Sequence, residues 1–436
     1  MRILEKSRLK AARALTAEVA KHLGGDLSLE LWNGEVLPLG ANARDDVRIV
    51  VRSPSAVRRL MLRPSLTTIF ELYALDELDI TGANPIEATR RFDHFKSLDV
   101  GKNVDRKVAV RAALPFLLSA PTRAQVAGFD KSVSSSVAAG RDDKELIQFH
   151  YDVSNEFYQR FLDANMVYSC GYFKTPQTSL DDAQVTKLDR VCRKLRLRPG
   201  DRFLDIGSGW GGLLIHAAKN YGAIGHGVTL SKAQYDYSVA RIAELGLADK
   251  IKVEMRDYRE IDAAQPYDKI AQIGMFEHVG LDNHDAHFKK VGQLLRPRGL
   301  YMHHAITRWA TPDLSKFREK TRYQKVITRF IFPGGELDYI GLTSTNLERH
   351  GFEVHDVEGM REHYKLTLEN WLERLYQQRE AAAAEIGATK MRLWLLYFTL
   401  FARAFERGTI GIFQTLASKR ATGASGLELW RGDLPD

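Results

Sequence analysis

Cysteine and long apolar runs are both scarce in this sequence. Its 436 residues include only two cysteines, Cys170 and Cys192, which lie outside any cluster of cysteine and histidine. We therefore expect neither a disulfide framework nor a zinc site, and the pattern is typical of a reducing cytoplasm. The most apolar late stretch, residues 393–401, is about nine residues long, whereas a membrane-spanning helix needs about 20. The charged start of the chain, residues 1–6, argues against a signal peptide.

Acidic residues are outnumbered by basic ones, which gives the chain a formal net charge of +8. This charge favours anionic partners, a class that includes phosphates, nucleic acid and the headgroup plane of an anionic membrane. Charge alone does not choose among them. The length is comfortable for two domains, each with a core of its own.

The N-terminal part of the chain predicts a small α+β unit. Residues 2–22 interleave basic and apolar side chains in the pattern of an amphipathic helix. This pattern fits a surface helix packed on its own domain, and it also fits a helix that lies on a membrane. Strand patterns follow at 27–31, 47–51 and 77–82, and a serine-capped helix is expected to begin at Pro54.

We place the first domain at residues 1–95. Residues 96–141 are expected to be a linker or lid, because small and polar side chains dominate the run 120–141 and cannot offset the entropy of ordering it. In residues 142–436, apolar strand patterns alternate with helix patterns, which predicts a doubly wound parallel α/β sheet. The strands are expected at 202–206, 224–230, 251–255, 268–275 and 299–306.

The first of these strands leads into a glycine turn. Asp205 precedes glycines at 207, 209 and 211, in the spacing G-x-G-x-G with an acid two residues before the first glycine. Glycine permits the sharp turn and lets a ligand approach the backbone closely. The spacing differs from the G-x-G-x-x-G dinucleotide pattern and fits the S-adenosylmethionine (SAM) loop of class I methyltransferases better. An ordinary strand-to-helix turn is the plainer alternative.

Two further strand ends carry polar residues that can hold such a cofactor. Ligands of doubly wound sheets bind at the carboxyl ends of the strands, so these residues are expected to meet in one crevice. After the second strand, Thr229, Ser231 and Gln234 can bond ribose hydroxyls. After the third, Asp257 can accept from an adenine amino group while Tyr258 packs beside the ring. The three strand ends together predict a SAM pocket.

The fourth and fifth strands carry candidate acid and base groups. The fourth leads to Glu277, which we expect to point toward the reactive side of the cofactor, with helix capping or ion pairing as the alternative. The fifth carries His303 and His304. Successive side chains of a strand point to opposite faces, so only one of these histidines can face the site.

Longer motifs identify a family. They are Phe149–Tyr158, Met166–Phe173, Arg202–Gly212, Gly274–Gly280 and Tyr364. With these motifs the chain resembles the cyclopropane-fatty-acyl-phospholipid synthases over roughly residues 140–420. That family also includes mycolic acid cyclopropane synthases and related fatty-acyl methyltransferases. The resemblance implies a class I SAM-methyltransferase fold with helical insertions at 142–436, a lipid-carrier-like domain at 1–95, and a homodimer.

The resemblance also implies roles for individual residues. The SAM-binding set would be Tyr168, Ser169, Asp205, Gly207, Gly209, Gly211, Thr229, Leu230, Gln234, Asp257 and Tyr258. The catalytic set, which would hold a bicarbonate ion, is Cys170, Glu277, His304, Ile306 and Tyr364, with Cys170 and Ile306 acting mainly through backbone groups. In this chemistry a cis double bond attacks the sulfonium methyl group, and bicarbonate removes a proton from the added carbon before the ring closes.

Two positions depart from the family pattern. Ser208 stands where cysteine is usual, a mild change because the loop acts through its backbone. Phe401 stands where some members carry a cysteine once considered a nucleophile, so a cysteine nucleophile is not expected.

The expected activity is methylene transfer from SAM to a cis double bond of a membrane phospholipid acyl chain. The enzyme would be cytoplasmic and bound peripherally at the inner membrane surface. A fatty-acyl methyltransferase that makes a methyl-branched or methylated unsaturated lipid is the alternative within the family. A lipid-carrier or nucleic-acid-binding module with a vestigial methyltransferase fold is the alternative from another class. Glu277, His304 and Tyr364 argue against it, and we expect no nucleic-acid partner and no metal.

Overall fold

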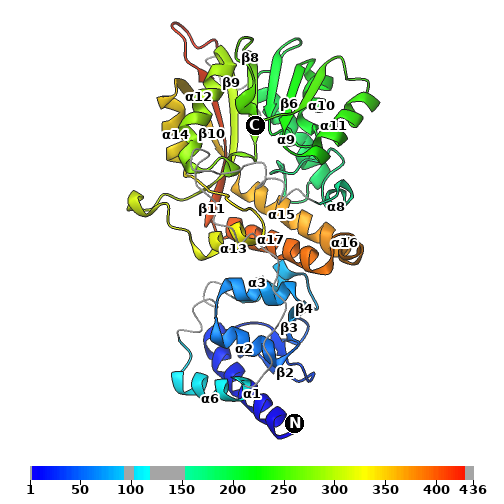
Figure 1. Ribbon diagram of the computed structural model, residues 1–436, viewed down its shortest axis with the longest axis vertical. Coiled ribbons are helices and arrows are strands. Elements are labelled where there is room, and N and C mark those ends of the chain that lie inside the picture. The colour runs from blue at the N-terminus through cyan, green and yellow to red at the C-terminus, as the bar shows by residue number, and fades with distance from the viewer. Residues whose placement is uncertain (1, 93–102, 118–152, 428–436) are drawn as a thin grey trace. The chain divides into compact units, whose positions relative to one another are not determined.

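The computed structural model describes residues 2–92, 103–117 and 153–427 (Figure 1). The chain divides into two compact units. Unit 1 contains residues 1–129, 320–331 and 375–400, and unit 2 contains residues 130–319, 332–374 and 401–436. The domain boundaries expected near residues 95 and 141, and the run 120–141, lie outside the described residues.

Unit 1 is built on a four-stranded sheet of order β2-β1-β3-β4, in which β1 and β3 are parallel and the other neighbours antiparallel. Its elements up to residue 117 are α1 (Arg2–Leu23), β1 (Ser28–Glu30), β2 (Val36–Pro38), β3 (Arg48–Val51), α2 (Pro54–Leu62), α3 (Leu66–Ala74), β4 (Leu78–Thr81), α4 (Pro85–Arg90) and α6 (Arg106–Leu117). The serine cap predicted for α2 is Ser53, whose Oγ accepts the N–H of Ala56. The two later segments of unit 1 hold α13 (Arg322–Phe330), α16 (Arg379–Ile386) and most of α17 (Ala388–Glu406).

Helix α6 lies within the stretch that the sequence assigned to a linker. Its buried side chains, Ala112 and Phe116, join the core formed by α1, α2 and the sheet. The ring of Phe116 meets the ring of Trp32 edge to face at 6.0 Å. Residues 106–117 therefore form part of the packed unit.

Unit 2 contains a seven-stranded sheet of order β10-β11-β9-β8-β5-β6-β7. The strands are β5 (Arg202–Ile206), β6 (Ile224–Thr229), β7 (Ile251–Met255), β8 (Tyr267–Ile273), β9 (Leu295–Arg308), β10 (Phe352–Gly359) and β11 (Ile410–Lys419). Strands β5 to β9 pair in parallel, while β10 and β11 are antiparallel additions at one edge. The doubly wound α/β fold expected from the sequence is confirmed, and all five expected strands are present.

Helices pack on both faces of this sheet (Figure 1). The helices of unit 2 are α8 (Asn155–Gln159), α9 (Leu180–Lys194), α10 (Gly212–Tyr221), α11 (Lys232–Glu244), α12 (His284–Leu294), α14 (Ile340–Arg349) and most of α15 (Arg361–Gln377). Apolar residues of α9 and α10 bury one face of the sheet, and those of α12 and α14 bury the other.

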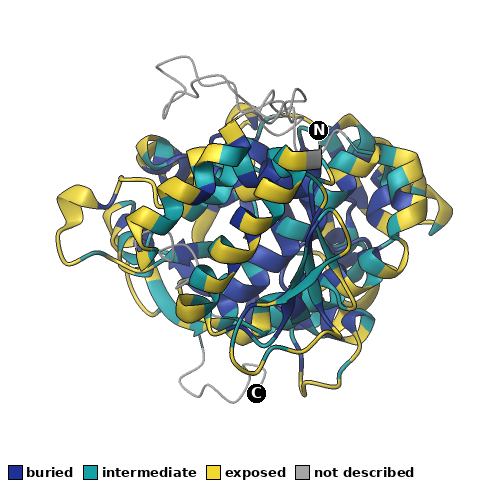
Figure 2. Ribbon diagram, turned by 90° about the horizontal axis from the view of Figure 1, so that it is seen from below, coloured by how far each residue is buried: buried dark blue, intermediate teal, exposed yellow. Residues whose placement is uncertain are grey.

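Alternation along β9 sends neighbouring side chains into different cores. Met302 packs with the α9 and α10 side, whereas Tyr301 and Ala305 pack with the α12 side. His303 and His304 consequently point to opposite faces, as the sequence predicted. The surface helices in Figure 2 likewise change between buried and exposed colours along their length. No helix within the described ranges is long and apolar enough to cross a bilayer.

Candidate active site

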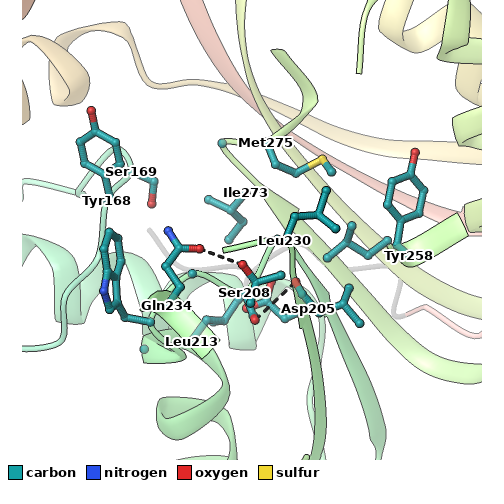
Figure 3. Close-up of a pocket in the computed structure, with 18 of the residues that line it drawn as sticks. Tyr168, Ser169, Asp205, Ser208, Leu213, Leu230, Gln234, Tyr258, Ile273 and Met275 are labelled. Carbon is teal, nitrogen blue, oxygen red and sulfur yellow. Dashed lines mark hydrogen bonds between the residues drawn. The ribbon is translucent and has the colours of Figure 1, made fainter. Parts of the chain in front are cut away.

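A pocket in unit 2 lies at the carboxyl ends of β5, β6, β7 and β8 (Figure 3). Ten of the eleven residues predicted to bind the cofactor line it, namely Tyr168, Ser169, Asp205, Gly207, Gly209, Thr229, Leu230, Gln234, Asp257 and Tyr258. Gly211 does not. Figure 3 shows Tyr168 and Ser169 on one side of the pocket and Tyr258 on the other. The ends of β5, β6 and β7, which the sequence predicted to meet, thus lie in one crevice, as expected of this fold.

The glycine loop is fixed by backbone hydrogen bonds. The N–H groups of Gly207 and Ser208 both donate to the carbonyl oxygen of Val228, each with an N–O distance of 3.0 Å. Gly207 has a φ of +78°, and a Cβ at this position would lie 3.1 Å from the side chain of Met275. Gly211 is the N-cap residue of α10 and has a φ of +85°, and a Cβ at this position would lie 3.2 Å from Ser238. Gly207 thus leaves room at the pocket wall, while Gly211 allows the turn to form.

Two charged groups are buried beneath this loop. Asp205 is only 4 % exposed, and burial raises the pKa of its carboxyl to about 7, with nearby Lys187 acting in the opposite direction. Lys187 is 1 % exposed, lines the pocket, and its Nζ donates to Ser169 Oγ over 2.9 Å. Burial lowers the pKa of Lys187 to about 8. A proton can therefore leave Lys187 or join Asp205 close to neutral pH.

Our sequence interpretation did not include Lys187. The signal was present, because Lys187 occupies the apolar face of α9 at helical spacing from Ala183 and Val191, which are fully buried. A lysine on a buried helix face is costly unless its ammonium group has a polar partner. The polar groups of a pocket wall can supply that partner.

The end of β6 forms a compact polar group. Thr229 Oγ1 donates to Gln234 Oε1 over 2.8 Å, as the dashed line to Gln234 in Figure 3 shows. Ser231 caps α11, because its Oγ accepts the N–H of Gln234. Thr229 and Gln234 face the pocket, whereas Ser231, a predicted ribose partner, does not line it.

The end of β7 presents Asp257 and Tyr258 as predicted, each with a partner from the protein. Both carboxylate oxygens of Asp257 accept from the Arg259 guanidinium, with Nε–O distances of 2.9 and 3.0 Å. The hydroxyl of Tyr258 lies 2.9 Å from His287 Nδ1. His287 Nε2 lies 3.3 Å from the hydroxyl of Tyr301, which in turn donates to Gln272 Oε1 over 2.6 Å. A buried hydrogen-bond chain thus runs from the pocket wall into the sheet.

None of the five predicted catalytic residues lines this pocket. Glu277 follows β8, and its Oε1 accepts the N–H of Ile306 over 2.6 Å. Its Oε2 is buried and has no hydrogen-bond partner among the described residues. Burial raises the pKa of Glu277 to about 7, although the bond from Ile306 opposes this rise.

His304 lies on the same face of β9 as Ile306, two residues earlier. Burial holds its pKa well below the usual value, so the imidazole is neutral at pH 7. With Gln414 Nε2 donating to Nδ1 over 3.2 Å, the ring hydrogen is on Nε2, which is buried and unpaired within the part of the chain that the structure describes. Glu277 and His304 therefore offer one open acceptor and one open donor, a combination that fits a small oxyacid such as bicarbonate.

Cys170 and Tyr364, the other two members of the predicted catalytic set, have contacts of their own in unit 2. The Cys170 thiol is fully buried, donates to the carbonyl of Gly171, and has its pKa raised by burial. A thiol in this state is a poor nucleophile. The ring of Tyr364, on α15, packs 4.9 Å from the ring of Phe405.

Two hydrogen bonds tie the segment that follows Cys170 to α15. Gly171 N–H donates to Thr367 Oγ1, and Phe173 N–H donates to His363 Nδ1, each over 3.0 Å. Because Tyr364 follows His363 directly, these bonds couple the cofactor-side segment to a residue of the predicted catalytic set. Burial lowers the pKa of His363, which keeps Nδ1 available as an acceptor.

Residues that flank Glu277 reach the pocket. Met275 and His278 line it on either side of Glu277 in the chain, and neither was predicted. Phe276, between them, packs in the core with His284 at 4.3 Å and His303 at 4.6 Å between ring centroids. The side chains of this turn thus divide between two places: Phe276 packs in the core, and Met275 and His278 line the pocket.

Comparisons with known proteins agree with this geometry. A family model described as mycolic acid cyclopropane synthetase matches residues 139–415. A probable fatty acid methyltransferase of Pseudomonas putida is 37 % identical over 393 residues, 90 % of this chain and 92 % of the relative. The cyclopropane-fatty-acyl-phospholipid synthase of Escherichia coli K12 is 34 % identical over 62 % of this chain and 66 % of the relative.

Solved structures give the same result. The cyclopropane synthase MmaA2 of Mycobacterium tuberculosis matches 63 % of this chain and 98 % of its own at 31 % identity, with a TM-score of 0.60. The mycolic acid cyclopropane synthase CmaA1 in complex with SAH and CTAB matches with a TM-score of 0.59 and 31 % identity, over 63 % of this chain and 98 % of its own. The glycine-loop pocket and these matches together assign the chain to the mycolic acid cyclopropane synthetase family of SAM-dependent methyltransferases.

Proposed function

We propose that the chain transfers a methylene group from SAM to a cis double bond in phospholipid acyl chains. The observation that carries the proposal is the pair of buried, unpartnered atoms Glu277 Oε2 and His304 Nε2, within the residues described, just beyond a SAM-type pocket. A methyltransferase that only transfers a methyl group to a nucleophile with a lone pair has no need of a base that accepts a proton from carbon. Ring closure requires one.

The residues of the pocket would hold SAM in the orientation that the family resemblance implies. Tyr168 and Ser169 would contact its methionine part, with Lys187 fixing the Ser169 hydroxyl. Thr229 and Gln234 would bond the ribose, and Tyr258 would pack against the adenine. SAM supplies the electrophilic methyl group.

Glu277 and His304 would hold bicarbonate, which when bound supplies the base for the deprotonation step. Neutral His304 would donate to it through Nε2, and Glu277 would fix its orientation through Oε2, each satisfying an otherwise unpaired buried atom. The Cys170 and Ile306 backbones and the Tyr364 side chain would complete the site. Cys170, His304 and Tyr364 are buried, and their burial would help to exclude water, which would otherwise capture a carbocation.

A second candidate function is fatty-acyl methylation without ring closure. It is favoured by the relative from Pseudomonas putida, which matches 90 % of this chain at 37 % identity and is described as a probable fatty acid methyltransferase. Both candidates share the first step and differ in which proton leaves the carbocation.

Two measurements test the proposal. Membrane lipids from cells that produce the protein should gain a species heavier by one CH₂ than an unsaturated lipid, and cells that produce Glu277→Gln should not gain it. With methyl-deuterated SAM, a cyclopropane keeps two of three labels in the new carbon, whereas a methyl branch keeps three. Three retained labels would establish the second candidate, and no heavier lipid with either protein would remove both.

The location and assembly of the protein belong to the same proposal. We infer a cytoplasmic enzyme that binds the inner membrane surface peripherally and acts as a homodimer. The net charge of +8 supports attraction to anionic lipids. Light scattering after size exclusion tests the dimer, since a monomer mass at all concentrations would exclude it.

A further inference from the structure

Helix α6 of unit 1 has an exposed face that mixes large apolar and basic side chains. The α6 face consists of Lys107, Val110, Arg111, Leu114 and Leu117. Residues at this spacing share one side of a helix. The three apolar members are 63 %, 60 % and 49 % exposed, in chain order, and the two basic members are exposed as well.

The opposite side of α6 is already occupied by its own unit. Ala112 and Phe116 are buried there, and Arg8 Nε donates to the carbonyl oxygen of Pro115 over 3.2 Å. These contacts pack one side of α6 against the rest of unit 1. The apolar side chains of the other side play no part in that packing.

The charges of α6 are of one sign. The helix contains no acidic residue, and its first turn begins with two basic residues, Arg106 and Lys107. The nearest acid, Asp105, precedes the helix and accepts the backbone N–H of Lys107. Basic side chains that flank an apolar stripe match a surface of negative charge over hydrocarbon, which is the headgroup layer of an anionic bilayer.

Helix α1, which the sequence offered as a membrane helix, is less suited to this role. Arg13 is paired with Glu35 at 2.6 Å, and Arg8 is engaged with α6. Ile3 is its one large apolar side chain that is exposed in the described structure. These contacts fit the alternative of a helix packed on its own domain.

We propose that the α6 face is the surface by which unit 1 docks on anionic phospholipid bilayers, with Val110, Leu114 and Leu117 inserted among the headgroups and Lys107 and Arg111 on lipid phosphates. The proposal rests on the proposed function in that a lipid substrate requires access to a membrane. Docking would keep the enzyme at its substrate between turnovers.

Vesicle co-sedimentation of the full chain tests this docking. The probes are vesicles of phosphatidylcholine alone and vesicles containing 30 % phosphatidylglycerol. The charge variant is Lys107→Glu with Arg111→Glu, and the apolar variant is Val110→Ser with Leu114→Ser. Lys219→Glu with Lys289→Glu, exposed positions on α10 and α12, is the control with the same change in net charge.

The wild type and the control should bind the anionic vesicles alike, and each α6 variant should bind them at least about tenfold more weakly. Binding of the wild type should fall with added salt. All four proteins should keep the same melting temperature, because the altered side chains are exposed. Equal binding by the α6 variants and the wild type would overturn the proposal. So would a lower oligomer mass of the α6 variants without vesicles, since the face would then belong to a second copy.

The methyl-transfer assay separates this proposal from the proposed function. Unsaturated lipid in detergent micelles requires no docking, so the α6 variants should be as active there as the wild type. A wild type that binds vesicles through α6 but methylates no lipid would remove the proposed function and leave the docking surface intact.

Discussion

The ammonium group of Lys187 donates a hydrogen bond of 2.9 Å to the hydroxyl group of Ser169, inside the wall of the cofactor pocket. Both residues are buried. The bond joins α9 to the segment that carries Tyr168 and Cys170, so a residue of the predicted SAM set is positioned by a charge that the family motifs do not include.

Replacing Lys187 with methionine should weaken SAM binding and change how stability depends on pH. Folding lowers the lysine pKa from 10.5 to about 8, so above pH 8 the unfolded chain holds a proton that the folded chain does not. Stability of the wild type relative to Lys187→Met should therefore rise between pH 8 and 10.5, by about 3 kcal/mol at most. Urea unfolding at both ends of this range measures the difference, and a pH-independent difference would contradict the assignment.

Replacing Glu277 with glutamine should abolish lipid modification while stabilising the fold above neutral pH. Folding raises the carboxyl pKa from 4.5 to about 7, so its contribution to stability is fully present below pH 4.5 and is lost as pH rises through 7. Glutamine keeps an acceptor for Ile306 N–H and carries no charge. The variant should gain up to about 3 kcal/mol relative to the wild type between pH 4.5 and 8. An active Glu277→Gln enzyme would exclude the carboxylate from the chemistry.

Replacing Gly207 with alanine should cost at least about tenfold in SAM affinity. The added Cβ would meet Met275 at the pocket wall, and the φ of +78° is unfavourable for alanine. Gly246→Ala is the matched control, because its φ is +67° and no atom lies within 4 Å of the added carbon. Both variants should lose roughly 1 kcal/mol of stability, but only Gly207→Ala should bind SAM weakly by calorimetry. Equal SAM affinity in the two would show that the wall tolerates a methyl group.

Replacing His363 with phenylalanine should lower kcat by about tenfold or more. The N–H of Phe173 would lose its acceptor, and the segment that carries Cys170 and Phe173 would be held less firmly against the helix that carries Tyr364. His363→Asn restores an oxygen acceptor near the position of Nδ1 and should recover most of the lost activity. Steady-state kinetics at saturating SAM compares the two. If asparagine rescues nothing, the ring itself matters, through its stacking on Tyr172 at 4.2 Å.

The strands that build the pocket were predictable because they combine short apolar runs with glycine and proline turn signals. The loop after β5 was predictable for the same reason, since its function resides in the backbone. Lys187 escaped prediction because burial of a single lysine depends on which face of α9 meets the sheet. Ser231 was predicted to bind ribose but caps α11, and a helix cap and a ligand hydroxyl use the same oxygen.

The sequence did not predict how the chain divides into the two units. Residues 320–331 and 375–400 belong to unit 1 although they lie far along the chain, and their grouping depends on tertiary contacts. Helix α6 was included in the predicted linker together with the small and polar run 120–141 that follows it, and its own sequence mixes basic and apolar residues. Its two buried positions, Ala112 and Phe116, are too few to be distinctive without the partners that they contact.

Because Tyr301 donates its hydroxyl proton to Gln272 Oε1, it has to accept from His287 Nε2, and His287 Nδ1 then accepts from the hydroxyl of Tyr258. Reversing or removing one member would leave a buried donor facing a donor, or an acceptor facing an acceptor, at the next link. Substitutions at these four positions should therefore be inherited as sets. His287, Tyr301 and Gln272 do not line the pocket, yet they constrain Tyr258, against which the adenine would pack.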